Sequence, residues 1–513
     1  MKQGKYQFGT PHLFFKRMTD MKRIMLIAMM VIAGACCFAQ EEESKYDSIY
    51  AEKKWPSAKR PQTPASDKLA AVTDKNVEKA SEDYMNETKD TFAFGMTNQI
   101  ETLMQTLISD EDCRLVNEAY DLFQETKSPR VRELILAYFA KLEDPCLEDF
   151  AVEVINEPFD YRKETITSCF EYVSAVKTKD AIPGIVAVLE SEDIEYFNYA
   201  LTALGQAGGP QEALYLSDYI ERDDLTLAQR QQLMRVLGQL KAVETWDKLS
   251  EIAQDTDENM YVRAYAAEAI GAMEVADSED ILIDLYEATE PVIREYVIRG
   301  LSHYSSEKTR KVIKQALKDD NYKVRLEALS VVEAQNISEC AKDLVYHCKT
   351  KEETVVKEKC YKVLAKLNTA DGNEYLVSVL KDKKAGDSAK AKVAAALLEN
   401  GSVGTKEIVE LASSTLKDDK SKSLRYALGK EIAKYSRPEF ASLCSEYLAS
   451  KDVMTQGTGL DMFANGRYES ARKAVQDLAA LAPDENDTNS KTKKSSNVNA
   501  TKAKKILAGM GAK

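Results

Sequence analysis

A basic residue inside a fixed frame of apolar positions returns about every 30 to 35 residues along this chain. Apolar or small side chains stand one position before the basic residue and three, four and seven positions after it. Around Arg263 the frame consists of Val262, Ala266, Ala267 and Ile270. Offsets of three, four and seven place side chains on one stripe of an α-helix, whereas side chains of a strand repeat every two residues. The pattern therefore predicts one amphipathic helix in each unit of a repeat array.

The same frame can be followed through most of the chain. Its anchor positions are Arg132, Phe197, Arg230, Arg263, Arg294, Arg325, Lys357, Lys390 and Arg425, and Phe197 replaces the basic residue in one copy. After each frame comes a short polar or glycine-bearing turn and a second amphipathic run, such as Ser278 to Ala288. Each unit is therefore a helical hairpin. Because one hairpin cannot bury its apolar stripe alone, neighbouring hairpins must stack and share a core.

The residues at these frames resemble a known repeat family. Asp320 to Leu329 resembles the Asp-x-x-x-Val-Arg-x-x-Ala-hydrophobic core of the short HEAT-like repeats, a class that includes the phycobilisome-lyase type. Met260 to Gly271 matches this core more closely still. The resemblance implies an all-α fold, an α-solenoid in which about eleven HEAT-like hairpins form a superhelix. It implies little about function, because scaffolds, lyases, hydroxylases and nucleic-acid binders share this repeat.

The solenoid is predicted to occupy residues 91–482. At roughly 10 Å between packed helix layers, the array would be on the order of 100 Å long and curved, with a large concave face. The basic anchor of each frame is expected to pair with acids of the adjacent unit and to form a structural ladder. Prolines stand where this scheme needs helix breaks or first turns, at Pro183, Pro210, Pro291 and Pro438.

Residues 1–39 have the layout of a secretory leader. Lys22 and Arg23 precede an uncharged run from Ile24 to Phe38, and small residues lie at its end. This run is shorter than the about 20 residues that a membrane-spanning helix needs. We therefore expect export to the periplasm or cell envelope, with Met21 as the true start of the chain. A cytoplasmic protein would require this leader to be misread.

Two processing outcomes fit the leader. Cleavage after Ala39 would leave Gln40 as a soluble mature terminus. Alternatively, Ala33-Gly34-Ala35-Cys36 resembles a loose lipoprotein box, which would place a lipid on Cys36 and attach the protein to a membrane. The sequence leaves both outcomes open.

The segments that flank the solenoid differ from it in composition. Residues 40–90 are acidic, contain Pro56, Pro61 and Pro64, and have few large apolar residues, so they are predicted to be a disordered tether. Residues 483–513 are predicted to be a disordered, Lys-rich tail, because Lys491 to Lys513 contains seven lysines and no acid.

The balance of charge indicates which partners the chain could bind. The whole chain carries −14; residues 1–39 carry +5 and residues 491–513 carry +7, so residues 40–490 carry −26. An acidic body repels phosphate backbones, and no nucleic-acid partner is expected for the array. The concave face is instead predicted to bind protein partners.

The sequence contains few indications of catalysis. Neither His303 nor His347 is followed by Glu, whereas HEAT-like metal hydroxylases use His–Glu pairs to bind iron. No catalytic, cofactor-binding or metal-binding residue is predicted, and no cofactor is expected. The seven cysteines after the leader are odd in number and scattered, which favours buried core residues over a disulfide framework. They are Cys113, Cys146, Cys169, Cys340, Cys348, Cys360 and Cys444.

Tyrosines in the second helices are candidate partner-binding residues that could line the concave face. They are Tyr215, Tyr219, Tyr286, Tyr346 and Tyr375. Tyrosine is enriched at binding hot spots, but it also caps helix ends and fills half-buried grooves in any solenoid.

Together these patterns predict an exported, non-enzymatic scaffold that mediates protein–protein interaction in the bacterial cell envelope. The alternative is a HEAT-like lyase or chaperone that acts on a chromophore or another small ligand. An absorbing or metal species in the purified protein would favour that alternative.

Overall fold

The computed structural model describes residues 60–75, 77–191, 194–482 and 498–511. All regular secondary structure in these ranges is helical, so the predicted all-α solenoid is confirmed. The leader of residues 1–39, including Met21 and Cys36, lies outside the described residues, as do residues 40–59. Export, cleavage and lipidation therefore stay predictions.

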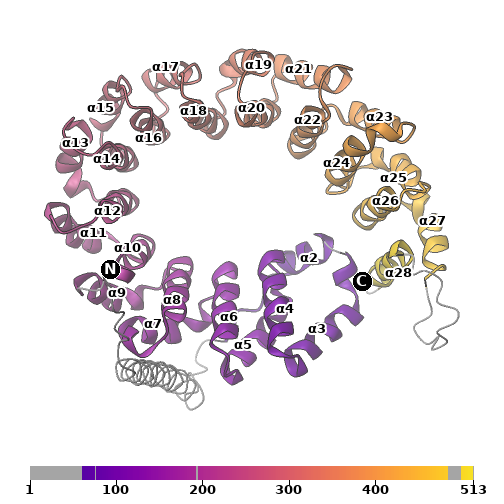
Figure 1. Cartoon of the computed structure of the whole chain (residues 1–513), viewed down its shortest axis with the longest axis horizontal. Helices are drawn as coiled ribbons and strands as arrows, with labels where there is room; N and C mark the ends of the chain where they lie inside the picture. Colours follow the sequence, from indigo (N-terminus) through magenta and orange to yellow (C-terminus); the bar gives the residue numbers. More distant parts are fainter. Residues whose placement is uncertain (1–59, 76, 192–193, 483–497, 512–513) are drawn as a thin grey trace, which may run out of the picture.

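The helices stand in two layers that form a ring (Figure 1). From α4 onward the even-numbered helices make up the inner layer: α4 (Thr97–Asp110), α6 (Pro129–Leu142), α8 (Lys163–Val176), α10 (Ile194–Ala207), α12 (Leu227–Gln239), α14 (Met260–Ala272), α16 (Pro291–Leu301), α18 (Tyr322–Gln335), α20 (Thr354–Leu367), α22 (Asp387–Asn400), α24 (Lys422–Ile432), α26 (Val453–Gly466) and α28 (Val498–Gly511). Each inner helix contacts the next one along the ring.

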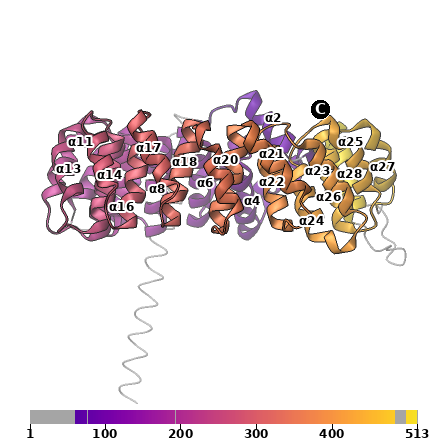
Figure 2. The ribbon, with the colours of Figure 1, turned by 90° about the horizontal axis from the view of Figure 1, so that it is seen from above.

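The odd-numbered helices make up the outer layer: α3 (Glu82–Phe94), α5 (Val116–Glu125), α7 (Glu148–Asn156), α9 (Ile182–Glu190), α11 (Pro210–Ser217), α13 (Trp246–Gln254), α15 (Ser278–Leu285), α17 (Glu307–Ala316), α19 (Ala341–Lys349), α21 (Ala370–Lys381), α23 (Thr405–Thr415), α25 (Ala441–Leu448) and α27 (Glu469–Ala479). The pairs from α4–α5 to α26–α27 are twelve hairpins, close to the number expected. Seen from its side, the ring is a low band, and the helices run across its height (Figure 2).

Short 3-10 helices join many of these elements. They are η1 (Val77–Ala80), η2 (Cys113–Leu115), η3 (Pro145–Leu147), η4 (Pro158–Asp160), η5 (Lys179–Ala181), η6 (Asp218–Glu221), η7 (Val243–Thr245), η8 (Ser338–Cys340), η9 (Asp419–Ser421) and η10 (Pro438–Phe440). The four prolines stand at the expected places, since Pro210 and Pro291 begin α11 and α16, Pro438 begins η10, and Pro183 lies in the first turn of α9.

Local signals in the sequence start the inner helices. The side chains of Asn259 and Asn321 accept hydrogen bonds from the first-turn N–H groups of α14 and α18, which would otherwise lack partners. Thr226 and Gln229 form a reciprocal capping box at the start of α12. The apolar frame then faces the core: Val262, Ala266, Ala267 and Ile270 have no exposed surface.

The anchor side chains of four consecutive frames form the expected ladder between adjacent units. Each of these four lies in the first turns of an inner helix and pairs with an acid in the linker that precedes the next inner helix. The pairs are Arg230–Glu258 (2.6 Å), Arg263–Glu290 (3.5 Å), Arg294–Asp319 (2.7 Å) and Arg325–Glu352 (2.6 Å). These pairs place the N-terminal ends of successive inner helices side by side, so these ends lie along one rim of the ring.

The predicted cysteine environment is confirmed as well. All seven cysteines of the repeats are buried and unoxidised in the structure. The thiol of Cys360 in α20 lies within hydrogen-bonding reach of Cys348 in α19, and this contact together with burial raises its pKa.

The C-terminal segment closes the ring, which corrects two expectations. Residues 498–511 of the predicted disordered tail form helix α28, which packs against α26, α27 and η1 (Figure 1). Its buried side chains Ala500, Ala503 and Ile506 recur every three residues and form an apolar stripe, while Lys504 and Lys505 are exposed. The high lysine content of this segment favoured the prediction of disorder over that of an amphipathic helix. The array is therefore a closed ring and not an open curved rod.

The other side of the seam is also helical, which corrects part of the predicted tether. Residues 66–75 form α2, where Val72 is buried three residues after Leu69. Arg114 holds η1 in place, because its guanidinium donates a hydrogen bond of 2.6 Å to the carbonyl oxygen of Lys79. On the opposite side, Asn499 of α28 donates to the carbonyl oxygen of Val453 at 2.9 Å.

Substitution of Ile506 by Lys is expected to open the ring. Ile506 has no exposed surface, and a charged side chain cannot be buried in that apolar contact without a partner. Loss of the contact should cost on the order of 2–5 kcal/mol and release α28 from η1. Small-angle X-ray scattering should then report a larger radius of gyration. The Lys505→Ala variant changes an exposed position of the same helix and serves as the control; equal scattering curves for both variants would contradict the closed ring.

Candidate partner-binding strip on the inner face

In the frames from Phe197 onward, three positions face the interior of the ring. The frame positions point into the core between the layers, so positions two, five and nine after the anchor lie on the opposite side of the inner helix. Two after the anchor stand Tyr199, Gln232, Tyr265, Tyr296, Glu327, Lys359 and Lys392. Five after the anchor stand Thr202, Arg235, Glu268, Arg299, Ser330 and Lys362. Each of these side chains is exposed or half-buried, as expected for the inner wall.

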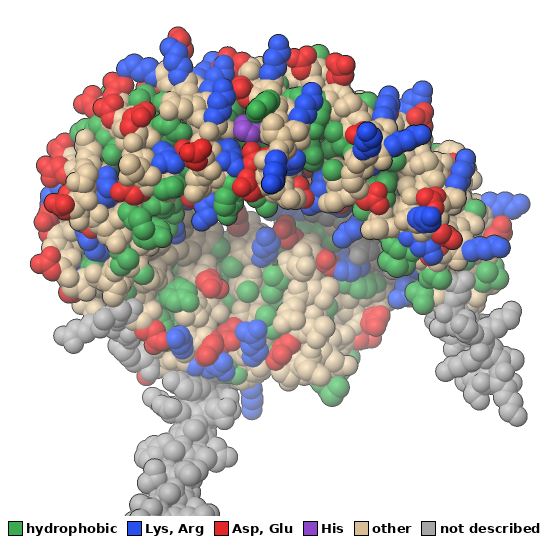
Figure 3. Space-filling view, turned by 45° about the horizontal axis from the view of Figure 1, so that its top comes forward, with side chains coloured by type: hydrophobic (Ala, Val, Ile, Leu, Met, Phe, Trp, Pro, Cys, Tyr) green, Lys and Arg blue, Asp and Glu red, His purple; other side chains and the backbone are tan. Residues whose placement is uncertain are grey.

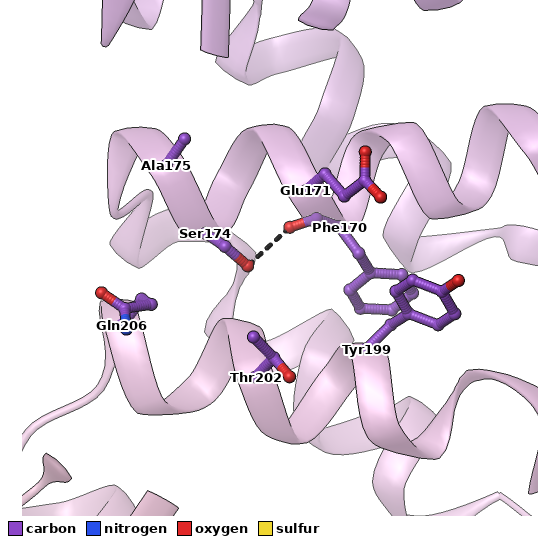
Figure 4. A pocket seen from close by; sticks show the side chains of 7 residues that line it. All are labelled: Phe170, Glu171, Ser174, Ala175, Tyr199, Thr202 and Gln206. Carbon is purple, nitrogen blue, oxygen red and sulfur yellow. Dashed lines mark hydrogen bonds between the residues drawn. The ribbon is translucent and has the colours of Figure 1, made fainter. Parts of the chain in front are cut away.

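An open pocket lies on this wall between α8 and α10. Its volume is about 520 Å³, and it is lined by Phe170, Glu171, Ser174, Ala175, Tyr199, Thr202 and Gln206. Figure 4 shows the rings of Phe170 and Tyr199 side by side at one end of the pocket, with centroids 6.4 Å apart and a tilt of 28°. The hydroxyl of Ser174 donates to the carbonyl oxygen of Phe170 at 2.7 Å, so it is already satisfied.

A chain of polar contacts continues from this pocket to the next helices. The Gln232 side chain of α12 donates a hydrogen bond of 2.9 Å to the hydroxyl of Thr202. One turn later, Arg235 donates to the hydroxyl of Tyr265 in α14 at 3.0 Å. The Arg235 guanidinium also lies 5.0 Å from the centroid of that ring, a cation–π arrangement. The pocket and the wall of α12 and α14 therefore form one surface.

The surface extends over α16 and reaches α18. The rings of Tyr265 and Tyr296 meet edge to face with centroids 4.7 Å apart. Arg299 lies 4.4 Å from the centroid of Tyr296 and donates hydrogen bonds to Glu295 at 2.7 Å and to Glu327 at 2.8 Å. We call the surface that runs from Tyr199 to Glu327 the inner strip.

Charges in the inner strip are held in fixed places. Burial raises the pKa of Glu268, and the nearby cations Arg299 and Arg235 lower it in part. Burial alone would lower the pKa of Arg299, but its hydrogen bond with Glu327 outweighs burial, so the pKa is raised overall. The inner strip thus offers rigid tyrosine rings and oriented guanidinium groups, which suit stacking and hydrogen bonding to a polypeptide.

Beyond the inner strip the wall becomes basic. Lys359 pairs with Glu333 between α20 and α18, and Lys392 pairs with Glu358 at 3.1 Å between α22 and α20. Lys362 has an exposed side chain on the same wall. The interior of the ring therefore changes from aromatic to basic along the chain, although the body as a whole is acidic.

The candidate tyrosines of the sequence analysis lie on the other layer. Tyr215, Tyr346 and Tyr375 belong to the outer helices α11, α19 and α21, Tyr219 to η6, and Tyr286 follows α15 (Figure 1). Their expected place on the concave face is wrong, because the second helix of each hairpin is the outer one. Tyr219 and Tyr286 are buried, as in the structural alternative, whereas Tyr346 is 66% exposed.

Histidine and the acidic clusters give no further site in the described part of the chain. The Nδ1 atom of His347 lies 2.9 Å from Glu352, which also pairs with Arg325. No group of three His, Cys, Asp or Glu side chains in the described ranges could hold a metal ion. Among the same residues, every helix is too short or too polar to cross a lipid bilayer.

Comparison with protein families finds one match that covers most of the chain. Residues 92–506 match the model of the family described as spirochaete HEAT repeat protein. A search of curated proteins found no match.

Solved structures with a similar fold share little sequence with this chain. The Escherichia coli protein YibA is 17% identical with a TM-score of 0.31, over 48% of this chain and 92% of YibA. Kap121p, a karyopherin, is 11% identical with a TM-score of 0.39, over 86% of this chain and 55% of Kap121p. The complex of CpcE and CpcF of phycocyanin lyase from Nostoc sp. PCC7120 is 14% identical with a TM-score of 0.28, over 49% of this chain and 94% of that one. At this level no functional conclusion follows.

The charge cluster of Arg325, Glu352 and His347 should make stability depend on pH. Burial alone would raise the pKa of Glu352, but hydrogen bonds with Glu353, Arg325 and His347 lower it to about 2. A carboxyl with a lowered folded pKa stabilises the fold above its unfolded pKa of about 4.3, and this contribution is lost as the pH falls through the folded pKa. Glu352→Gln should therefore cost about 1.5–3 kcal/mol at pH 7 and roughly half as much at pH 3.

Thermal unfolding at pH 3, 5 and 7 tests this expectation. The melting temperature of Glu352→Gln should lie below that of the wild type at pH 7, and the difference should shrink at pH 3. Glu307→Gln, at an exposed position of α17, is the control and should follow the wild type. A difference that stays constant from pH 7 to pH 3 would contradict the lowered pKa of Glu352.

Proposed function

The chain belongs to the spirochaete HEAT repeat proteins, and we propose that it is a non-enzymatic scaffold that holds a segment of a partner protein against the inner wall of its ring. The inner strip carries this proposal. It combines Tyr199, Tyr265 and Tyr296 with Arg235 and Arg299 on four consecutive inner helices. Tyrosine and arginine are the side chains most enriched at the energetic centres of protein interfaces.

The length of the inner strip favours a polypeptide over a small ligand. From α10 to α18 it crosses four helix intervals, and at about 10 Å for each interval it spans about 40 Å. An extended peptide of about 12 residues covers that distance at 3.3 Å for each residue. A single drug-sized molecule would fill only the pocket between α8 and α10. The rigid rings and paired guanidinium groups lose little conformational entropy on binding, which favours affinity.

The site of action in this proposal is the cell envelope. The layout of the leader, with Lys22 and Arg23 before an uncharged run, supports export. Mass spectrometry of the N-terminus of the native protein is expected to find Gln40 or a lipidated Cys36 as the first residue. An intact Met1 or Met21 would show that the leader is not processed and would overturn the proposed export.

Substitutions in the inner strip should release the partner. Tyr199 and Arg235 have exposed side chains, so a Tyr199→Ala, Arg235→Ala double variant should fold as the wild type does. Two hot-spot truncations of at least about 1 kcal/mol each predict a loss of partner binding of about tenfold or more. The measurement is quantitative mass spectrometry of proteins captured with a tagged ring from gently crosslinked native cells.

The matched control is Tyr346→Ala, because Tyr346 is an exposed tyrosine of the outer layer. Its captured proteins should equal those of the wild type. A partner that is retained by the inner variant and lost by the Tyr346 variant would place binding on the outer layer and refute the inner strip. An eluate without a partner but with an absorbing or metal species would favour the lyase or chaperone alternative.

A further inference from the structure

Exposed apolar side chains mark the rim that is formed by the N-terminal ends of the inner helices. Leu227 at the start of α12 is 43% exposed, and Met260 and Tyr261 at the start of α14 are 42% and 43% exposed. Val292 of α16 is half-buried at the corresponding place. First-turn positions of three consecutive inner helices therefore present an apolar row outside the shared core.

The linkers between these first turns carry a concentration of acids. The acidic sector comprises residues 221–227, 255–261 and 286–292, three linkers and the helix starts that follow them. Its acids are Glu221, Asp223, Asp224, Asp255, Asp257, Glu258, Glu287 and Glu290, and its one basic residue is Arg222. In Figure 3, Asp and Glu side chains gather over the left side of the ring, where Figure 1 places α11, α13 and α15.

Ion pairs neutralise only part of this charge. Glu258 and Glu290 pair with the ladder anchors, Arg222 pairs with Asp224, and Lys248 pairs with Glu221. No ion pair within the described residues involves Asp223, Asp255, Asp257 or Glu287, and all four side chains are exposed. Four uncompensated carboxylates thus lie in the linkers that precede the apolar first turns of α12, α14 and α16.

Several other linkers along the rim lack this excess of acid. The linker of residues 382–387 contains two lysines and two aspartates, and the linker of residues 417–422 contains three lysines and two aspartates. At the start of α20, Val355 is exposed as well, but Lys351 accompanies Glu352 and Glu353 in the linker before it. Unlike these linkers, those before α12, α14 and α16 combine exposed apolar side chains with uncompensated negative charge.

We propose that the acidic sector is a docking surface for a positively charged amphipathic segment of a partner protein. Lysine or arginine side chains of that segment would meet the four carboxylates, and its apolar face would cover Leu227, Met260 and Tyr261. Each buried apolar side chain then gains from leaving water, and the charges set orientation and association rate. A membrane with anionic lipids and a second copy presenting the same sector are disfavoured by like charge.

This surface differs from the inner strip. It lies on the rim and is built from linkers and first turns, whereas the inner strip is built from the middle of the inner helices. Tyr261 stands one helical turn before Tyr265, so the two surfaces adjoin at α14. The inference goes beyond the proposed function, because a segment could dock on the rim whether or not the inner strip is occupied.

Binding of model peptides to the full-length ring tests the docking surface. The probe is a fluorescein-labelled peptide of Lys and Leu with one apolar helical face; a scrambled peptide of equal composition and a Glu/Leu peptide are the reference ligands. Fluorescence anisotropy at 50 mM and 300 mM salt gives the dissociation constants. Asp255→Lys with Asp257→Lys should weaken binding of the probe at least tenfold at low salt, and the loss should shrink at high salt. Met260→Ser with Tyr261→Ser should weaken it at least tenfold at both salt concentrations.

Matched controls separate this surface from general acidity. Glu307→Lys with Asp371→Lys changes the same number of charges on exposed positions of α17 and α21, and Val355→Ser changes an exposed apolar residue elsewhere on the rim. Both should bind the probe within about twofold of the wild type. Circular dichroism melting should show that every variant is folded.

Several results would overturn the proposal. Equal affinity for the amphipathic and scrambled peptides would show that binding depends on charge alone and not on the apolar row. A loss of affinity in the control variants as large as in the sector variants would mean that the probe binds anywhere on the acidic body. Binding to phosphatidylglycerol vesicles with affinity for the Lys/Leu peptide unchanged in the sector variants would identify a lipid surface in place of a polypeptide.

Discussion

Close contact between successive inner helices determines the shape of the molecule. A side chain at Gly271 of α14 would place its Cβ only 2.4 Å from the Cα of Gly300 in α16, and one at Gly238 of α12 would lie 2.8 Å from the Cα of Ala269. These glycines let the inner backbones approach closely, and inner neighbours contact each other more extensively than outer neighbours do. Each hairpin is therefore a wedge with its narrow side inward. Twelve such wedges bring α28 back to η1 and close the ring.

The anchor ladder complements this packing at the rim. Removing charges from water is costly, so each buried arginine needs a partner that meets it in a fixed place. For Arg230, Arg263, Arg294 and Arg325 the acid before the next inner helix supplies that partner, as Asp319 does for Arg294 with a distance of 2.7 Å. The ladder thereby fixes how one unit is set against the next. The core and the ladder do not use the positions two, five and nine after the anchors from Phe197 onward, so these positions can form the inner wall.

The frame of the repeat made the helices, their core positions and the ladder predictable, because each depends on neighbours within about 30 residues along the chain. The inner strip was harder to find. Arg235, Tyr265, Tyr296 and Arg299 stand at regular offsets in the sequence, but both helices of a hairpin are amphipathic, and periodicity does not tell which one faces inward. Tyr346 and Tyr375 were therefore assigned to the wrong layer. Helix α28 escaped detection because its stripe of Ala500, Ala503 and Ile506 is short and lies among lysines.

The sequence by itself determined that this chain is an all-α repeat array with buried cysteines and basic anchors, since an amphipathic hairpin can bury its stripe only by stacking on its neighbours. Only the tertiary structure decided that the array closes into a ring, that the first helix of each hairpin faces inward, and that four carboxylates remain uncompensated beside Met260 and Tyr261. Closure depends on a small angle repeated over twelve hairpins and on contact between two elements more than 400 positions apart, η1 and α28. The total angle that closes the ring cannot be read from any single copy of a repeat of about 30 residues.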